Sequence, residues 1–194
     1  MCAQIAPIDI PKSYRLLNVG GTTLISAKHN GKVDVMAATW ACPLDFNAVS
    51  VVIGGNRYTR KLINESGYFA VQLPTVGILD QVMKVGTISK NDDEDKLAHS
   101  GVELFYQDGY DIPLVKGCNG WLICKVIPEP HNEETYGLIF GEIIAGWSDE
   151  RVFKNGHWDF EHADESLSTV HYVAGGHFYA MGKHYEIKGV PDEL

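Results

Sequence analysis

The distribution of apolar residues along this chain is more typical of β-strands than of helices. Apolar and polar positions alternate, or short apolar runs occur, in segments that are bounded by Gly, Pro or Asn. Residues 22–29 and 32–41 flank Asn30-Gly31, the dipeptide most typical of a tight hairpin turn. Several strands joined by hairpins, with few helices, predict a mainly β fold in which an antiparallel sheet closes into a barrel. Further strands are predicted at residues 48–54, 67–73, 121–127 and 136–147.

A few short helices are predicted between these strands. The clearest begins with Asn56 as its N-cap and ends just before Gly67. A second short helix is predicted at residues 77–85. The polar and acidic residues 87–96 indicate a loop that leads into another short helix.

The remaining segments give weaker patterns. Residues 43–47 are predicted to form a loop, and a turn is expected between the strands at 121–127 and 136–147. Residues 152–185 are ambiguous, with Gly175-Gly176 as their clearest break. Since no repeat, low-complexity tract or linker interrupts the chain, we expect residues 1–194 to form a single domain.

Composition and charge narrow the range of functions. The chain has 194 residues, 45% of them hydrophobic, and a formal net charge of −9, which argues against nonspecific binding to nucleic acids or anionic membranes. It shows no signal peptide and no apolar stretch near the ~20 residues that cross a bilayer, so we expect a cytoplasmic protein. The four cysteines form no C-x-x-C motif, and we expect no metal site.

The helix after Asn56 carries cations where free backbone N–H groups and the helix dipole favour anions. Arg57, Arg60 and Lys61 lie in or next to its first turn, and Thr59 adds a hydroxyl donor. Such an arrangement is explained if a phosphate group docks among these side chains. The alternative is a solvated, slightly strained helix start.

A second marker is the end of the strand at residues 32–41. The small residues before Trp40 leave backbone N–H and C=O groups accessible, and these groups can hydrogen-bond the edge of a planar heterocycle. Trp40 would add an apolar wall beside it. The alternative is a core strand with a buried tryptophan.

In these motifs the chain resembles the flavin reductase-like family of FMN-binding split β-barrels, and within it the flavoredoxin-type proteins. The resemblance spans roughly residues 14–183, with Asp34 where the family usually has Asn and Ala37 where Thr is common. The matching positions are Met36, Thr39, Trp40, Arg57, Thr59, Ile63, Ser66, Gly67, Gly86, Ser89, Asp95, Lys96, Cys124, Phe140, Gly141, Glu142, His171, Gly175, Gly176, Tyr179 and Gly182.

The resemblance implies an antiparallel split β-barrel that holds FMN noncovalently near a homodimer interface. The 5′-phosphate would lie at the helix start among Arg57, Thr59, Arg60 and Lys61, with Thr87, Ser89, Lys90 or Lys96 closing from the other side. The isoalloxazine ring would lie against residues 36–40. His171 would lie near the flavin or at the subunit interface. The predicted cofactor-binding residues are Met36, Ala37, Ala38, Thr39, Trp40, Arg57, Tyr58, Thr59, Lys61, Thr87, Ser89, Lys90, Lys96 and His171.

Two residues keep more than one interpretation. Lys96 either lies near the N1/O2 edge of the flavin, where it would raise the flavin's reduction potential, or forms a helix-surface salt bridge with Asp92 or Asp93. Cys42 either reacts beside the flavin or is a small apolar filler.

We therefore expect an FMN-dependent oxidoreductase in which no side chain need act as a general acid or base, and the catalytic residues remain unknown. Its electron donor and acceptor would be small molecules such as NAD(P)H and free flavin, or a redox protein in flavoredoxin-like electron transfer. The alternatives are a non-catalytic FMN-binding or sensing module and a barrel that has lost FMN.

Overall fold

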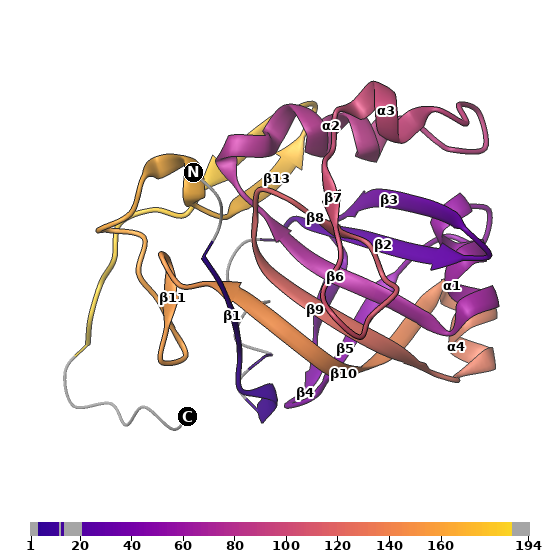
Figure 1. Cartoon of the computed structure of the whole chain (residues 1–194), viewed down its shortest axis with the longest axis horizontal. Helices are drawn as coiled ribbons and strands as arrows, with labels where there is room; N and C mark the ends of the chain where they lie inside the picture. The colour runs from indigo at the N-terminus through magenta and orange to yellow at the C-terminus, as the bar shows by residue number, and fades with distance from the viewer. Residues whose placement is uncertain (1–3, 12, 14–20, 188–194) are drawn as a thin grey trace.

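The main sheet of the protein is antiparallel and curls into a barrel, as a computed structural model of residues 4–11, 13 and 21–187 shows (Figure 1). The strand order is β3-β2-β6-β9-β10-β5-β4, and β1 pairs with β10 outside this path. The strands of this sheet are β1 (Ile5–Pro7), β2 (Thr23–His29), β3 (Lys32–Ala38), β4 (Ala41–Asp45), β5 (Ala48–Val52), β6 (Tyr68–Pro74), β9 (Cys118–Ile127) and β10 (Leu138–Asp149).

Short helices and hairpins surround the barrel. Figure 1 shows α1 and α4 at one end of it and α2 and α3 together along one side. The helices are α1 (Tyr58–Ser66), η2 (Val76–Ile78), α2 (Leu79–Thr87), α3 (Lys96–Ser100), α4 (Pro130–Tyr136) and η3 (Glu165–Leu167). The hairpin strands are β7 (Leu104–Phe105), β8 (Leu114–Val115), β11 (Phe153–Lys154), β12 (His157–Trp158), β13 (Val170–Ala174) and β14 (His177–Ala180).

The barrel is split between β3 and β4. These strands are consecutive in the sequence but lie at opposite ends of the strand order, with only Thr39 and Trp40 between them. Across the described ranges, β3 pairs only with β2 and β4 pairs only with β5. The two edges of the curled sheet are therefore joined through the chain and not through a hydrogen-bonded ladder.

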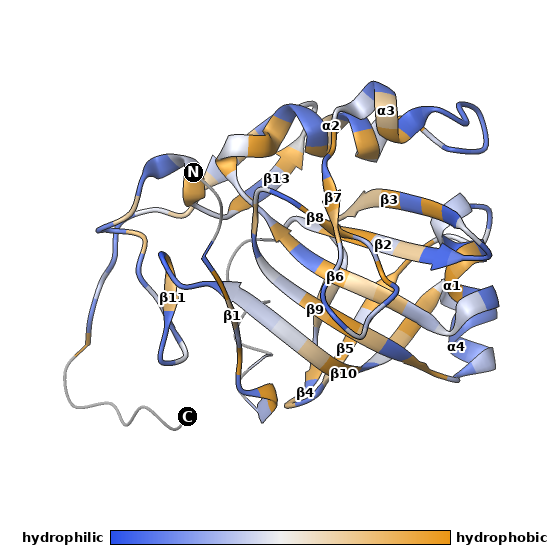
Figure 2. Ribbon diagram, in the orientation of Figure 1, coloured by the Kyte–Doolittle hydropathy of each residue, from blue (hydrophilic) through white to orange (hydrophobic). Residues whose placement is uncertain are grey.

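The strands bury side chains on both faces. Ile25 of β2 faces the inner core with residues of β5, β6, β9 and β10, while its neighbour Leu24 contributes to an outer core beneath α2 and the β7–β8 hairpin. This arrangement follows from the strand period of two, which sends successive side chains to opposite faces. Figure 2 shows apolar positions concentrated in the strands and hydrophilic residues in the loop between α2 and α3.

The structure confirms the hairpin and the end of the first helix. Asn30 and Gly31 have φ values of 47° and 75°, the positive values that a type I′ turn requires. Gly67 ends α1 in the left-handed conformation with φ of 74°. The predicted N-cap is wrong, because Arg57 occupies that position with an extended backbone and no side-chain cap.

Two predicted connections are also wrong. Residues 43–47 were expected to form a loop, but Ala41–Asp45 form β4, an edge strand that pairs with β5. The turn predicted before residue 136 contains the helix α4, which begins with Pro130, a residue suited to a first helical turn. In the ambiguous segment, Gly175 and Gly176 form the turn of the β13–β14 hairpin. No helix in the described ranges is both long and apolar enough to cross a bilayer.

Candidate functional site

The start of α1, the strand β3 and the loop before α3 meet at one edge of the barrel. The ammonium Nζ of Lys90 donates to the carbonyl of Val33 on β3 at 2.8 Å. The side-chain amide of Asn91 donates to the carbonyl of Asn56, just before α1, at 2.9 Å. These bonds fix the 88–95 loop against the two elements that the sequence analysis assigned to the cofactor.

A buried ion pair joins the same elements. Asp34 of β3 is 1% exposed and Lys96 of α3 is 2% exposed, and their Oδ1 and Nζ atoms lie 3.1 Å apart. The hydroxyl of Thr59 on α1 donates to Asp34 Oδ2 at 2.6 Å. Burial lowers the pKa of Lys96 from its ordinary value, and the attraction of Asp34 opposes this shift.

This geometry corrects two expectations. Lys96 forms no helix-surface salt bridge with Asp92 or Asp93, because its side chain lies inside, against Asp34. The Thr59 hydroxyl, which we expected to donate to a phosphate, donates to Asp34 instead. Both side chains are held by Asp34, which is far from Thr59 and from Lys96 in the sequence.

Arg60 does not belong to the phosphate site that the sequence analysis predicted. It is 4% exposed, and its guanidinium donates to the carbonyls of Ile53 and Gly137 at 3.1 and 3.3 Å. The same group bonds Asn64 Oδ1 at 2.8 Å and pairs with Glu133 of α4 at 3.3 Å. Arg60 therefore holds α1 against α4 and the end of β5.

The other cations at the start of α1 have different surroundings. Arg57 is exposed at the helix start, and Lys90 Nζ lies 5.8 Å from the centroid of the Tyr58 ring. Lys61 instead lines a recess of about 190 Å³ next to the β2–β3 turn, together with Lys32. The structure thus places Lys90 against β3 and Lys61 at the hairpin turn, with Arg57 exposed at the helix start.

The two hydroxyl groups predicted at the end of α2 both have protein partners. Thr87 is exposed, and its hydroxyl donates to the carbonyl of Met83 at 2.7 Å. Ser89 lies next to Lys90, and its hydroxyl accepts from the backbone N–H of Asn91 at 3.2 Å. A hydroxyl keeps further hydrogen-bonding capacity after one such bond, so Ser89 retains the means to contact an anion beside Lys90.

The predicted ring-binding segment lies along the free edge of β3. Met36 packs against the inner core. Ala37 lies close to α2, since a Cβ added to Gly86 would be 3.0 Å from the Cβ of Ala37. Thr39 is exposed, and Trp40 is 72% exposed, so the alternative of a buried tryptophan is wrong. Ala38, which lies between Ala37 and Thr39, is buried in the inner core.

Cys42 and His171 lie outside this cluster of contacts. Cys42 is exposed on β4, with its Sγ 3.1 Å from Ser50 Oγ, and is therefore not a buried filler. His171 of β13 is exposed, and its Nδ1 accepts from the backbone N–H of Gly21 at 3.1 Å. Its predicted place near a flavin or a subunit interface stays a prediction.

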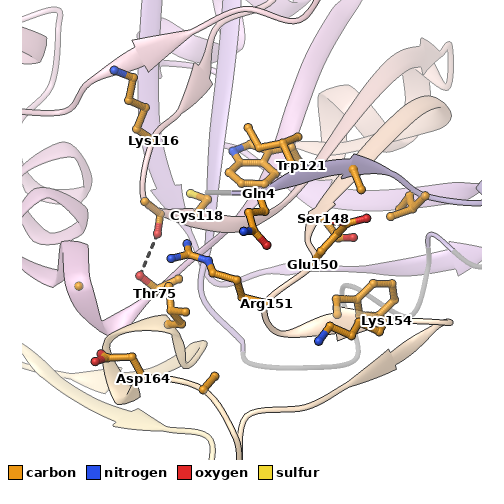
Figure 3. A pocket seen from close by; sticks show the side chains of 18 of the residues that line it. Gln4, Thr75, Lys116, Cys118, Trp121, Ser148, Glu150, Arg151, Lys154 and Asp164 are labelled. Atoms are coloured by element: carbon orange, nitrogen blue, oxygen red, sulfur yellow. Dashed lines mark hydrogen bonds between the residues drawn. The ribbon is translucent and has the colours of Figure 1, made fainter. Parts of the chain in front are cut away.

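A large groove of about 1560 Å³ lies elsewhere, between β1, the β7–β8 hairpin and the segment after β10 (Figure 3). Its lining mixes Lys116, Glu150 and Asp164 with apolar residues such as Trp121, and it contains none of the predicted cofactor-binding residues. Arg151 extends into it, and its Nε contacts the buried carboxylate of Asp149 at 2.9 and 3.1 Å. No sequence motif pointed to this groove, because its lining comes from segments without a shared pattern.

Comparisons with known proteins agree with the fold and with the family resemblance. The chain matches the flavin reductase like domain over residues 17–170. An FMN-binding domain of a flavin reductases-like enzyme from Shewanella baltica is 45% identical, with a TM-score of 0.95 over 97% of this chain and 100% of that one. Flavoredoxin from Methanosarcina acetivorans is 25% identical, with a TM-score of 0.68 over 88% and 89% of the two chains.

A sequence relative extends this agreement over nearly the whole chain. The protein YddH of Escherichia coli K12, whose function is uncharacterized, is 33% identical over 186 residues, which make up 93% of this chain and 97% of YddH. The expected mainly β, split-barrel fold and the expected class of FMN-binding relatives are confirmed by these likenesses.

Proposed function

The chain belongs to the flavin reductase-like family, and we propose that it is an FMN-binding oxidoreductase whose site lies along the free edge of β3. The observation that carries this proposal is the placement of Lys90 beside the first half of β3 and of the exposed Trp40 just beyond its end, with Arg57 exposed at the nearby start of α1. At ~3.3 Å per residue the distance from Val33 to Ala38 is about 17 Å. A ligand with a phosphate at one end and a planar ring at the other suits this layout.

The side chains present fit such a ligand. The guanidinium of Arg57, the ammonium of Lys90 and the hydroxyl of Ser89 would hold the phosphate. The unpaired backbone edge of β3 would hydrogen-bond the heterocycle, with Trp40 as an apolar wall. Bound FMN would supply the electron exchange, while these residues bind it, orient it and shield it from water.

Reduction of a small acceptor with NAD(P)H is the activity that we propose first. Flavoredoxin-like electron transfer with a protein partner is the second candidate. It is supported by the apolar side chains of Leu44 and Phe46, which are exposed with Trp40 around β4. Leu44 and Phe46 are also our candidates for the subunit contact of a homodimer. A non-catalytic FMN-binding module remains the contrasting outcome of the test below.

Visible absorption spectroscopy tests the proposal. The purified protein would be titrated with FMN, and NADH or NADPH would then be added without oxygen. We expect a bound-flavin spectrum that bleaches with one of the two nucleotides. Bleaching by a reduced redox protein but by neither nucleotide would favour the carrier. Bleaching by a chemical reductant alone would favour the binding module.

A matched pair of variants locates the phosphate site. Lys90→Met should weaken FMN binding without much loss of stability, whereas Lys154→Met, on the β11–β12 hairpin, should leave FMN binding unchanged. Absence of any bound flavin in the unmodified protein would refute the assignment, and equal effects of the two substitutions would refute the proposed location.

A further inference from the structure

Asp34 occupies two of the groups that the family resemblance assigns to the flavin phosphate. Its Oδ2 accepts from the Thr59 hydroxyl at 2.6 Å, and its Oδ1 lies 3.1 Å from Lys96 Nζ. All three side chains are at least nine-tenths buried. Asp34 also stands where the family usually has Asn, a residue of the same shape without the charge. The Asp34 carboxylate therefore engages the Thr59 hydroxyl and the Lys96 ammonium within the protein.

The carboxylate changes the charge that a phosphate would meet. Lys90 bonds the carbonyl of Val33, and Lys96 pairs with the adjacent Asp34. Arg57 lies two residues before Thr59, which bonds the same carboxylate, so the three cations lie around one stretch of β3. Asp34 neutralises one of them, Lys96, and accepts the hydrogen bond that the Thr59 hydroxyl could otherwise donate to a phosphate. Of the other predicted cations, Arg60 is engaged with α4, and Lys61 lines the recess next to the β2–β3 turn. Among the described residues, Arg57 and Lys90 are thus the predicted cations near β3 that pair with no carboxylate, fewer than the sequence predicts.

We propose that Asp34 is a specificity-determining residue that weakens the hold on the flavin phosphate, so that FMN exchanges with the solution and is not retained as a resident prosthetic group. The inference rests on the proposed FMN-binding function. A flavin that leaves the protein is a substrate that is reduced and released. The Asp34 carboxylate pairs with Lys96 and thereby keeps the affinity for the phosphate low.

A double-mutant cycle read with two ligands tests this proposal. The unmodified protein, Asp34→Asn, Lys96→Gln and the double variant would each be titrated with FMN and with riboflavin, which lacks the phosphate, by quenching of flavin fluorescence. The ratio of the two affinities isolates the phosphate contribution. Asp34→Asn should raise the preference for FMN by about tenfold, which is the order of effect of one charge near a phosphate in a partly screened site.

The other variants should change the same ratio in a defined way. Lys96→Gln leaves Asp34 uncompensated and should lower the preference for FMN by about tenfold, while the double variant should return close to the unmodified protein. Glu103→Gln removes the carboxylate of the distant, exposed pair with Lys116 and serves as the matched control. It should leave the ratio unchanged. If Asp34→Asn fails to fold, the comparison of Lys96→Gln with the double variant still isolates the charge of Asp34.

The outcomes separate this inference from the proposed function. A preference for FMN that is unchanged or lower when the Asp34 charge is removed would overturn the inference, and so would FMN that survives extensive dialysis of the unmodified protein. Failure of the unmodified protein to bind either flavin would instead overturn the proposed function.

Discussion

Arg60 and Arg57 are three residues apart on one helix, yet the structure gives them opposite roles that mutation can separate. We expect Arg60→Met to destabilise the fold and Arg57→Met to weaken flavin binding. Met keeps the apolar stem of the side chain, so that the comparison removes the guanidinium groups and little packing. Arg60 is buried with four protein partners, whereas Arg57 is exposed.

The magnitude for Arg60 follows from its partners. Loss of the guanidinium leaves the carbonyl of Ile53 without this donor and the Glu133 carboxylate without its cation, and groups left unsatisfied in this way cost ~1–3 kcal/mol each. The Glu133 side chain is 20% exposed and Gly137 still accepts from a backbone N–H, so water and other donors recover part of the loss. We expect about 3 kcal/mol in total, or roughly 6–12 °C in Tm for a chain of this size.

Urea unfolding followed by tryptophan fluorescence would measure the free energy of unfolding of both variants, and flavin titration would measure their affinity for FMN. Arg57→Met should change the free energy of unfolding by less than ~0.5 kcal/mol, as is usual for a surface substitution. The reasoning fails if Arg60→Met unfolds like the unmodified protein, or if folded Arg60→Met loses as much FMN affinity as Arg57→Met.

Three further predictions follow from packing, ionisation and exposure. Gly141→Ala should cost ~1–3 kcal/mol in thermal unfolding, because its methyl group would lie 2.5 Å from the ring of Phe69; an unchanged Tm would contradict this. Hydrogen bonding to Asp93 raises the pKa of His99 and lowers the pKa of Asp93. The contribution of His99 to the free energy of unfolding is therefore present below its unfolded pKa and is lost as pH rises through its folded pKa. The contribution of Asp93 is present above its unfolded pKa and is lost as pH falls through its folded pKa. An NMR titration of His99 should give a midpoint above 6.5 that falls in Asp93→Asn, and no fall would argue against the pair. Trp40→Ala should change the free energy of unfolding by under ~0.5 kcal/mol despite the size of the side chain, and a cost of several kcal/mol would show that the residue is buried in solution.

Local patterns in the sequence predicted those parts of the fold that depend on neighbouring residues. The turn at Asn30-Gly31 and the end of α1 at Gly67 each need positive φ values that few residues adopt, so the sequence at these points specifies the backbone. The edge strand β4 was missed because Pro43 and Asp45 are typical of loops. They are tolerated at a sheet edge, where a bulge lies between them.

The candidate site was predicted in outline, since β3, α1 and the 88–95 loop do meet. The charge pattern of the site was not predicted, because the carboxylates that neutralise its cations are distant from them in the sequence. Arg60 meets Glu133 across 73 positions, and Lys96 meets Asp34 from a different element. A helix start with three cations gives no sign of which one turns inward, and only the fold brings the neutralising carboxylates to them.

The seam between β3 and β4 also has a consequence for motion. Because no described ladder crosses it, the two sheet edges can move apart by bending at Thr39 without breaking a ladder hydrogen bond, while Trp40 stays tied to β5 through the 2.9 Å bond from the Val52 N–H to its carbonyl. Breathing of this kind admits solvent to the outer amides of β3 while the central strands β6 and β9 stay protected. A ligand that lies along β3 and reaches Trp40 would restrain the seam, so amide hydrogen exchange there should slow when the site is filled.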